Sequence, residues 1–254
     1  MKKYVKDLKI VDSERLPQGY VLLKLRDEAN SLPPMLPGQF VQVRIDNTPD
    51  VMLRRPISVN FVDISDNTLW LLVHAVGPGT AHLATLREGD MVNCLFPLGN
   101  SFSMSGYERP LLVGGGVGTA PMLFLGAGLK AQGITPTFLL GGRTAKDVLQ
   151  LDEFAKYGRV CVTTEDGSLD TKGFVTQHPV LEETFDFIAT CGPKPMMKAV
   201  AAFAKAKDIR CEVSLENLMA CGLGACLCCV EKTTTGHRCV CTEGPVFNTN
   251  ELDW

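Results

Sequence analysis

The sequence predicts three successive segments of different fold class. An antiparallel β barrel is expected over residues 1–105, a parallel α/β sheet over 106–210 and a cysteine-rich subdomain over 211–254. Short strand-like runs fill the first segment, strands alternate with helical patterns in the second, and six of the ten cysteines lie within residues 221–241. A chain of 254 residues is long enough for two compact domains and an appendage.

The composition argues against several classes of protein. The net charge is −3 and no basic run is present, so nucleic-acid binding has no electrostatic basis. The N-terminus is charged rather than apolar, so we expect neither a signal peptide nor a membrane span. The four cysteines outside residues 221–241 are scattered in apolar strands, which argues against a secreted disulfide scaffold and favours a reducing cytoplasm.

The first segment has the pattern of a closed antiparallel barrel with one helix. Its strand candidates are short, rich in β-branched residues and often alternating, and they cover residues 21–25, 39–45, 57–63, 68–76 and 91–97. Proline, glycine and Asp-Asn turns separate these strands. A single short helix fits residues 80–86.

Two features of the barrel could bind an anionic cofactor. Arg54 and Arg55 precede Ser58 on a strand candidate, where a guanidinium suits a pyrophosphate and the hydroxyl can reach a flavin ring nitrogen. The alternative is a solvated arginine pair on an edge strand. Residues 77–80, Gly-Pro-Gly-Thr, open the helix candidate, and they indicate either an anion site on free N–H groups or an ordinary capped turn.

The second segment alternates buried strands with helices. The strands are expected at residues 111–113, 137–140, 160–162, 185–189 and 211–213, and the helices at 121–132, 145–157 and 193–207. This order predicts a parallel sheet with helices on both faces. Ligands bind such sheets at the carboxyl ends of the strands.

A glycine loop follows the first of these strands. Residues 114–119, Gly-Gly-Gly-Val-Gly-Thr, would let a pyrophosphate approach the backbone at a helix start, and tight strand–helix packing is the alternative. Arg143, rather than an acidic residue, follows the next strand. Turn residues at 164–168 and 191–196 end two further strands on the same rim. Together these strand ends predict a nucleotide cleft.

The C-terminal segment carries four cysteines in a C-x4-C-x2-C pattern with a later fourth, at Cys221, Cys226, Cys229 and Cys241. This is the plant-type spacing of a 2Fe–2S cluster. The alternative is a structural zinc site, whose ligands usually include two C-x2-C pairs or histidines. Because Cys228 adjoins Cys229, the third ligand is ambiguous by one residue.

The motifs, in this order, resemble the ferredoxin–NADP reductase superfamily. With the cysteine motif and the Gly-Pro-Val-Phe sequence at 244–247, the chain resembles the electron-transfer subunits of bacterial dihydroorotate dehydrogenase B. The resemblance implies FAD in the barrel, at Arg55, Pro56, Ile57, Ser58, Leu72, Val73, His74, Gly79 and Thr80. It implies NAD(H) on the second segment, at Gly114, Gly115, Gly116, Gly118, Thr119, Arg143, Cys191, Gly192 and Pro193. It implies a 2Fe–2S cluster at Cys221, Cys226, Cys229 and Cys241. The superfamily often has tyrosine where Ile57 stands.

The resemblance also implies an oxidoreductase subunit of pyrimidine biosynthesis that works with a separate FMN-bearing catalytic subunit, two copies of each forming a heterotetramer. NADH gives two electrons at once and a 2Fe–2S cluster takes one at a time, so FAD must stand between them. No residue of this chain need act as an acid or base, since the base for dihydroorotate would belong to the partner. NADH is expected to be preferred over NADPH. Apolar residues beside the cysteines would contact the partner or pack locally; these are Leu218, Met219, Leu223 and Leu227.

Other functions fit parts of the pattern. Similar chains serve as subunits of NADPH–ferredoxin transhydrogenases and sulfide dehydrogenases, which have a different partner. A redox-sensing module, in which the cluster only reports or stabilises, is an alternative of a different class.

Overall fold

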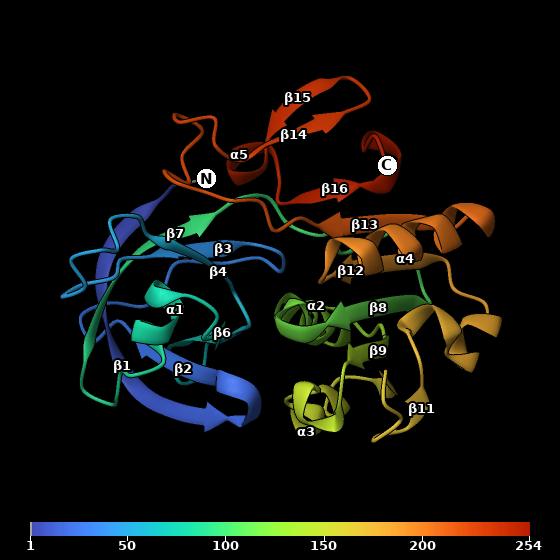
Figure 1. The fold of residues 1–254 in the computed structure, drawn as a ribbon, viewed down its shortest axis with the longest axis horizontal. Coiled ribbons are helices and arrows are strands. Elements are labelled where there is room, and N and C mark those ends of the chain that lie inside the picture. The colour runs from blue at the N-terminus through green and yellow to red at the C-terminus, as the bar shows by residue number, and fades with distance from the viewer. Residues whose placement is uncertain (1) are drawn as a thin grey trace.

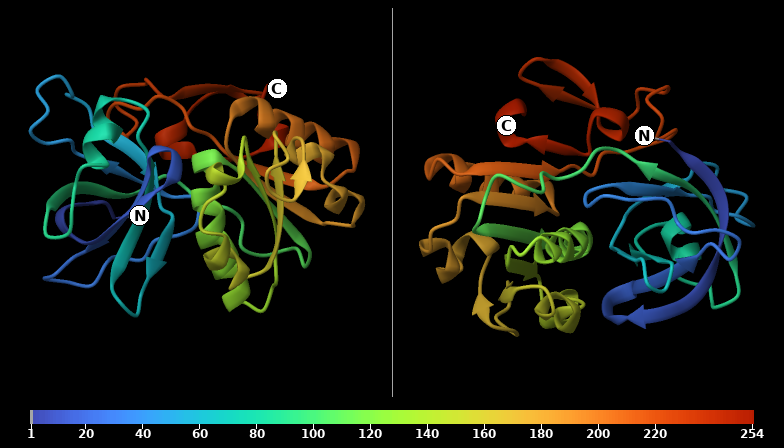
Figure 2. Two further views of the ribbon diagram at one scale, coloured as in Figure 1. Left: turned by 60° about the horizontal axis from the view of Figure 1, so that its bottom comes forward. Right: turned by 180° about the vertical axis from the view of Figure 1, so that it is seen from behind.

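Two seven-stranded sheets lie side by side, and the C-terminal segment crosses above both of them (Figure 1). The same arrangement is seen from behind in Figure 2. The structure is a computed structural model that describes residues 2–254. No helix in this range is both long and apolar enough to span a membrane.

The first sheet is antiparallel, has the strand order β4-β3-β7-β1-β2-β6-β5, and curls around a core of aliphatic side chains. Its strands are β1 (Tyr4–Leu16), β2 (Tyr20–Arg26), β3 (Phe40–Val43), β4 (Arg55–Ser58), β5 (Phe61–Asp63), β6 (Thr68–His74) and β7 (Met91–Leu98). The helix α1 (Pro78–Leu83) lies near the predicted position. The barrel is confirmed as a curled sheet, but it is not closed, because the edge strands β4 and β5 do not pair within residues 2–254.

Two local predictions for the barrel were incomplete. Strand β1 escaped the sequence pattern because its thirteen residues are mostly charged or exposed, and only Leu8 and Ile10 are buried. The single strand expected over residues 57–63 is interrupted between β4 and β5. There Asn60 is buried and its amide Nδ2 donates to the Ala120 carbonyl (3.2 Å) and to Gln150 Oε1 (3.1 Å), both in the second unit.

The second sheet has the order β11-β10-β9-β8-β12-β13-β16 and is parallel except for β16. Its strands are β8 (Pro110–Gly115), β9 (Thr137–Gly142), β10 (Arg159–Thr164), β11 (Thr171–Lys172), β12 (Phe187–Cys191), β13 (Arg210–Ser214) and β16 (Val246–Asn248). The helices are α2 (Ala120–Ala131), α3 (Leu151–Ala155) and α4 (Lys194–Ala206). Leu112 packs with the α2 side and Leu111 with the α4 side, so helices cover both faces as predicted.

The helix expected over residues 145–157 was wrong in its first half. A 3₁₀ turn, η3 (Ala145–Asp147), ends at an extended residue, and Gln150 then adopts a left-handed conformation with φ 57° before α3 begins. The Asp147 carboxylate accepts from the Thr144 amide and hydroxyl and caps the start of η3, whereas the extended Val148 and the left-handed Gln150 separate this turn from α3. The remaining short turns are η1 (Pro17–Gly19), η2 (Gly116–Thr119), η4 (Val175–Gln177), η5 (Pro179–Glu182) and η6 (Thr249–Glu251).

The two sheets meet through an apolar contact. Tyr20, Leu22 and Leu72 of the barrel pack with Ala120 and Leu149 of the second unit, all of them buried. In Figure 1, α2 lies on the side of its sheet that faces the barrel. This packing, with the Asn60 hydrogen bonds, holds the rims of both units next to each other.

The C-terminal segment is tied to both sheets. It forms the hairpin β14 (Val230–Thr233) and β15 (Gly236–Cys239), the short α5 (Val240–Glu243), and then β16, which pairs with β13. Asn100, just after β7, donates to the Val246 carbonyl (2.8 Å) and accepts from the Val246 amide (2.9 Å). Along the chain, the hairpin and the preceding loop are therefore inserted between β13 and β16, two paired strands of the second sheet. The predicted division at residue 210 stays a prediction, and it falls at the first residue of β13.

Candidate functional site

Arg55 and Gly79 come together at the barrel rim. A Cβ built on Gly79 would lie only 2.6 Å from Arg55 Nε, so the guanidinium lies directly over this glycine. Arg55 donates to the Leu53 carbonyl (2.7 Å), and within residues 2–254 it forms no ion pair with a carboxylate. Thr80 Oγ1 accepts from the Gly77 amide and shapes the turn. A half-buried cation over a bare backbone fits a pyrophosphate, as predicted for FAD.

Arg54 has a different role. Its guanidinium donates to the Gln42 and Asn93 carbonyls (both 3.1 Å) and to Asn93 Oδ1 (2.5 Å). These contacts hold β3, β7 and the segment before β4 together. Of the two adjacent arginines, only Arg55 is placed to meet a ligand.

The other predicted FAD residues differ in what they can offer. Val73 is in the barrel core and Leu72 in the contact between the units, so their side chains are already packed. Ile57 is partly buried against the barrel core. Ser58 is half-buried on β4, and His74 is half-buried at the end of β6. The structure therefore leaves Arg55, Ser58, His74 and the turn at Gly79 as groups that could reach a flavin.

A cavity of about 480 Å³ lies at the carboxyl ends of β8, β9 and β10, where the sequence predicted nucleotide binding. Four predicted residues line it: Gly115, Gly116, Arg143 and Pro193. The polar and charged groups around it include Tyr20, Asp147, Thr163 and Glu165. A concave site with few polar groups at strand ends is typical of dinucleotide binding.

The other predicted glycines in this region serve packing. A Cβ on Gly118 would lie 2.5 Å from the backbone of Cys191 and Gly192, and a Cβ on Gly114 would lie 2.8 Å from the Thr119 backbone. Thr119 is buried, and its hydroxyl donates to the Gly116 carbonyl (2.9 Å). Gly114, Gly118, Thr119, Cys191 and Gly192 thus shape the loop without lining the cavity.

Cys191, at the end of β12, faces Glu216 at an Sγ–Oε1 distance of 3.8 Å. Burial and the nearby carboxylate raise the pKa of the Cys191 thiol well above its usual range, so the thiol stays protonated. Solvent reaches the Glu216 side chain, yet protein surrounds it closely, and this desolvation raises the pKa of Glu216. No local sequence pattern indicates this pair, because Cys191 ends β12 and Glu216 lies in the loop after β13.

The predicted cluster cysteines converge in the loop between β13 and β14 and at α5. The Leu223 amide donates to Cys221 Sγ (3.3 Å), the Gly224 amide to Cys241 Sγ (3.2 Å) and the Cys241 amide to Cys229 Sγ (3.4 Å). Hydrogen bonds from the Leu223 amide and then from Cys226 lower the pKa of Cys221 to about 6, which favours the thiolate. Amides directed at cysteine sulfurs are the surroundings that an iron–sulfur cluster needs.

These thiols lie in two neighbouring pairs. Cys226 is within hydrogen-bonding reach of Cys221, and Cys229 is within reach of Cys241. Across residues 2–254, no three side chains of the metal-binding kinds converge as one metal ion would require. Two pairs suit two irons that each take two thiolates.

The loop rests on the barrel. A Cβ on Gly222 would lie 2.8 Å from Gln42 Cγ and 3.2 Å from Leu98 Cδ1, so glycine is needed for this close approach. Cys229 and Cys241 are almost fully buried with Phe40 and Leu98 of the barrel, whereas Cys226 and Cys228 are exposed. The cysteine site is thus buried on the barrel side and open on the other.

Comparison with known proteins identifies these regions. Residues 216–253 match the family described as the iron-sulfur cluster binding domain of dihydroorotate dehydrogenase B, and residues 112–202 match the oxidoreductase NAD-binding domain. The chain is 40% identical to a protein of Shouchella clausii named dihydroorotate dehydrogenase B (NAD(+)), electron transfer subunit, over 85% of this chain and 86% of the relative. A relative of the same name from Lysinibacillus sphaericus is 39% identical over 94% of this chain and 95% of its own length.

The chain belongs to the family of dihydroorotate dehydrogenase B electron transfer subunits. A solved structure of an NADH-dependent reduced ferredoxin-NADP oxidoreductase, studied for flavin-based electron bifurcation, superposes with a TM-score of 0.88 at 30% identity, covering 97% of this chain and 90% of that one. Phthalate dioxygenase reductase, at 21% identity and a TM-score of 0.62, covers 79% of this chain and 64% of its own and shares the fold. The ferredoxin reductase resemblance predicted from the motifs is confirmed, and the family's chemistry uses FAD, NAD(H) and a 2Fe–2S cluster.

Proposed function

We propose that the chain passes electrons between NAD(H) and the catalytic subunit of dihydroorotate dehydrogenase B, through FAD in the barrel and a 2Fe–2S cluster at Cys221, Cys226, Cys229 and Cys241. The observation that carries this proposal is the position of the cysteine loop. It packs through Gly222 on the barrel and has its other side open to solvent. The proposed units are residues 1–105 for FAD, 106–210 for NAD(H) and 211–254 for the cluster.

The residues of this chain position and insulate the cofactors. FAD, when bound, exchanges a hydride with NAD(H) and single electrons with the cluster. Arg55 and the Gly79–Thr80 turn would hold the FAD pyrophosphate, with Pro56, Ile57, Ser58 and strand residues 72–74 beside the ring. Gly115, Gly116, Arg143 and Pro193 would line the NAD(H) site, and the protonated Cys191 thiol beside Glu216 ends the strand next to it.

The same arrangement supports an assignment of the third cluster ligand. Cys229 is buried in the core beneath the loop and its sulfur accepts the Cys241 amide, whereas Cys228 is exposed. We therefore propose Cys229 as the ligand. Cys239 is half-buried on β15 and is left without an assigned role.

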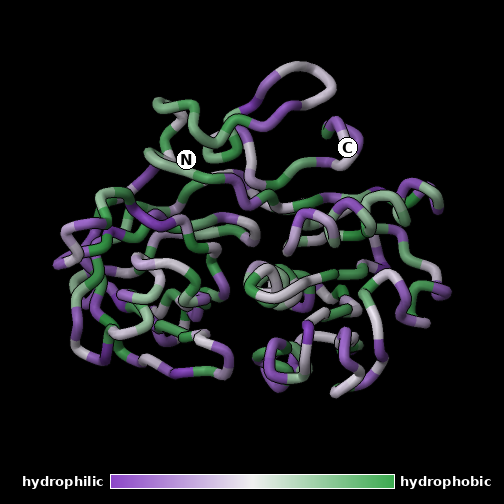
Figure 3. The backbone as a smooth tube through the Cα atoms, in the orientation of Figure 1, coloured by the Kyte–Doolittle hydropathy of each residue, from purple (hydrophilic) through white to green (hydrophobic). Residues whose placement is uncertain are grey.

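The partner would dock on the open side of the cysteine loop. Leu218, Leu223 and Leu227 are 84%, 47% and 63% exposed, while Met219 packs against the core. Much of this loop is coloured as hydrophobic in Figure 3. Exposed leucines around exposed Cys226 favour contact with another protein chain. We propose that this partner carries FMN, that two copies of each chain assemble, and that the complex works in the cytoplasm.

An anaerobic NADH titration of the purified chain, followed by visible absorbance, tests the proposal. NADH should bleach the flavin and reduce the cluster, and the chain alone should reduce artificial acceptors without oxidising dihydroorotate. Adding the catalytic subunit should then link NADH to orotate. Conversion of dihydroorotate by the chain alone would contradict the electron-transfer assignment, and an absence of flavin bleaching would favour a sensing module.

Two further observations test the docking face and the rival partner. Leu223→Asp should keep the cluster spectrum but lose coupling to the catalytic subunit; full coupling would place the docking face elsewhere. The 30% identity to the bifurcating oxidoreductase favours a transhydrogenase subunit as the second candidate. NADPH-linked ferredoxin turnover with a different partner, and none with the dihydroorotate subunit, would support it.

A further inference from the structure

Tyr20 is the barrel residue that lines the cavity at the carboxyl ends of the second sheet. It begins β2, directly after the η1 turn, and is only 4% exposed. Its ring stacks on His74, with centroids 4.0 Å apart and planes 10° from parallel. The aromatic face is therefore fixed by the strand predicted to contact the flavin, and the hydroxyl points away toward the second unit.

The Tyr20 hydroxyl reaches the glycine loop. It is the nearest atom to a Cβ built on Gly116, at 3.6 Å, and no side chain or backbone group within residues 2–254 forms a hydrogen bond with it. The packing needs only the ring, which phenylalanine would supply equally well. The residue is buried, but its hydroxyl opens onto the cavity, where it is a hydrogen-bond donor that the protein itself does not use. Such a donor, fixed at a cavity wall by the packing of its ring, indicates a ligand contact.

The chemistry around the hydroxyl narrows the choice of ligand. Gly116 belongs to the loop whose bare backbone would carry a pyrophosphate, and Arg143 and Asp147 lie nearby in the same cavity. Burial, and then the charge of Asp147, raise the pKa of Tyr20, so the hydroxyl is protonated and can donate. A phosphate oxygen is the acceptor that such a position favours.

We propose that the Tyr20 hydroxyl donates a hydrogen bond to the pyrophosphate of the bound nicotinamide dinucleotide. This inference rests on the proposed function and assigns a positioning residue for the nucleotide that comes from the barrel. Since Tyr20 is stacked on His74, the contact fixes the dinucleotide relative to the flavin strand. Nucleotide binding then depends on the alignment of both units.

Tyr107 provides a matched control. It is also a buried, stacked tyrosine, with its ring 4.1 Å from that of Phe187, but its hydroxyl donates to the Ser103 carbonyl and does not line the cavity. Tyr107→Phe removes a hydrogen bond within the protein, and Tyr20→Phe removes one offered to the ligand. Tyr107→Phe should therefore lower the stability of the protein and leave ligand binding unchanged, whereas Tyr20→Phe should weaken ligand binding and leave the stability unchanged.

The test measures NAD⁺, ADP-ribose and adenosine binding to the FAD- and cluster-loaded chain by isothermal titration calorimetry, with thermal unfolding alongside. Tyr20→Phe should bind NAD⁺ and ADP-ribose about tenfold more weakly, leave adenosine binding unchanged and keep the wild-type unfolding temperature. Tyr107→Phe should unfold at a lower temperature and bind all three ligands normally.

Several results would overturn the inference. They are unchanged NAD⁺ affinity in Tyr20→Phe, an equal loss for adenosine, and a fall in its unfolding temperature as large as that of Tyr107→Phe. A wild-type chain that binds no NAD⁺ and is not reduced by NADH would instead refute the proposed function. The two failures are thus distinguishable.

Discussion

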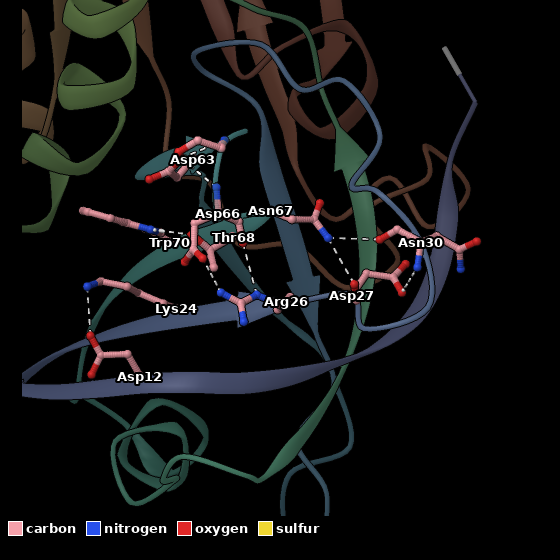
Figure 4. Close-up of polar contacts among 11 residues, drawn as sticks. Asp12, Lys24, Arg26, Asp27, Asn30, Asp63, Asp66, Asn67, Thr68 and Trp70 are labelled. Carbon is pink, nitrogen blue, oxygen red and sulfur yellow. Dashed lines mark hydrogen bonds and ion pairs between the residues drawn. The ribbon is translucent and has the colours of Figure 1, made fainter.

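Two hollows of this molecule contrast in how their polar side chains are satisfied. The outer face of the barrel carries a polar hollow of about 770 Å³ between β1, β2 and the turns beside them. Its charges pair with each other, as Lys9 with Glu28, Lys24 with Asp12 and Arg26 with Asp66. Figure 4 shows the last two pairs. Little charge is left there to bind a ligand.

The cavity at the strand ends is smaller, about 480 Å³, but its groups are not paired in this way. The Tyr20 hydroxyl has no hydrogen-bond partner in residues 2–254, and neither has the buried Thr163 Oγ1. Arg143 and Glu165 form no ion pair in that part of the chain. Polar groups left unpaired at a concave site therefore make this cavity the better candidate for ligand binding, although it is the smaller of the two.

The largest expected effect is loss of the cluster on substitution in the cysteine loop, where buried Cys229 and exposed Cys228 are adjacent. Cys229→Ser should abolish the cluster's visible and EPR signals, because the buried thiol faces Cys241. Exposed Cys228 is the matched control, and Cys228→Ser should keep both signals. The reverse pattern would exchange the two assignments.

Two arginines of the barrel differ in the same way, since Arg26 forms an ion pair with Asp66 and Arg55 forms none within residues 2–254. Arg55→Ala should weaken FAD retention about ten- to a hundredfold, since a charge-assisted contact contributes about 1.5–3 kcal/mol. Arg26→Ala removes a guanidinium already paired with Asp66 and should leave flavin occupancy unchanged after dilution. Equal flavin loss in both variants, or no loss in Arg55→Ala, would contradict the assignment of Arg55 to the FAD pyrophosphate.

The pH dependence of stability tests the paired polar groups of the barrel, because the Asp27 carboxylate is one of them. Burial alone would raise its pKa, but hydrogen bonds from Lys6 and from the Ala29 and Asn30 amides lower the pKa below its ordinary 3.8; Asn30 is drawn with Asp27 in Figure 4. The stabilisation is complete above the ordinary pKa and is lost as pH falls through the lower folded value. Asp27→Asn should cost about 1.5 kcal/mol at pH 7. Urea unfolding at pH 7 and pH 3 should show this difference in unfolding free energy narrowing in acid, and a difference of constant size would contradict the pairing.

Glu165 gives the smallest expected effect. Its carboxylate lines the nucleotide cavity beside Arg143, so it should repel the 2′-phosphate of NADPH and contribute to a preference for NADH. Glu165→Gln should lower the NADH/NADPH ratio of kcat/KM about two- to fivefold, as expected for one exposed charge. Glu183→Gln, in the surface pair with Arg159, is the control. A wild-type ratio that favours NADPH would overturn the predicted cofactor preference.

The sequence predicted what local patterns encode. Alternation located β2, β6 and β7, and cysteine spacing predicted one site for Cys221, Cys226, Cys229 and Cys241, because both signals lie within short stretches of chain. Strand β1 was missed since charges outnumber its two buried residues, and the helix over 145–157 was interrupted by the left-handed Gln150. Tyr20 lies in the barrel, far along the chain from the glycine loop, and only the packing of the two units brings it into the cavity.

The return of the chain through β16 has a consequence for modularity. The iron-binding loop and hairpin are an insertion between two paired strands, and Asn100 fastens the returning end to the barrel. Truncation before the loop would strip β16 from β13 and leave an unprotected sheet edge. The cluster-binding segment therefore cannot be transferred to another protein by fusion at a terminus. A chimaera would have to exchange the insertion between Ser214 and Val246 and keep both strands in place.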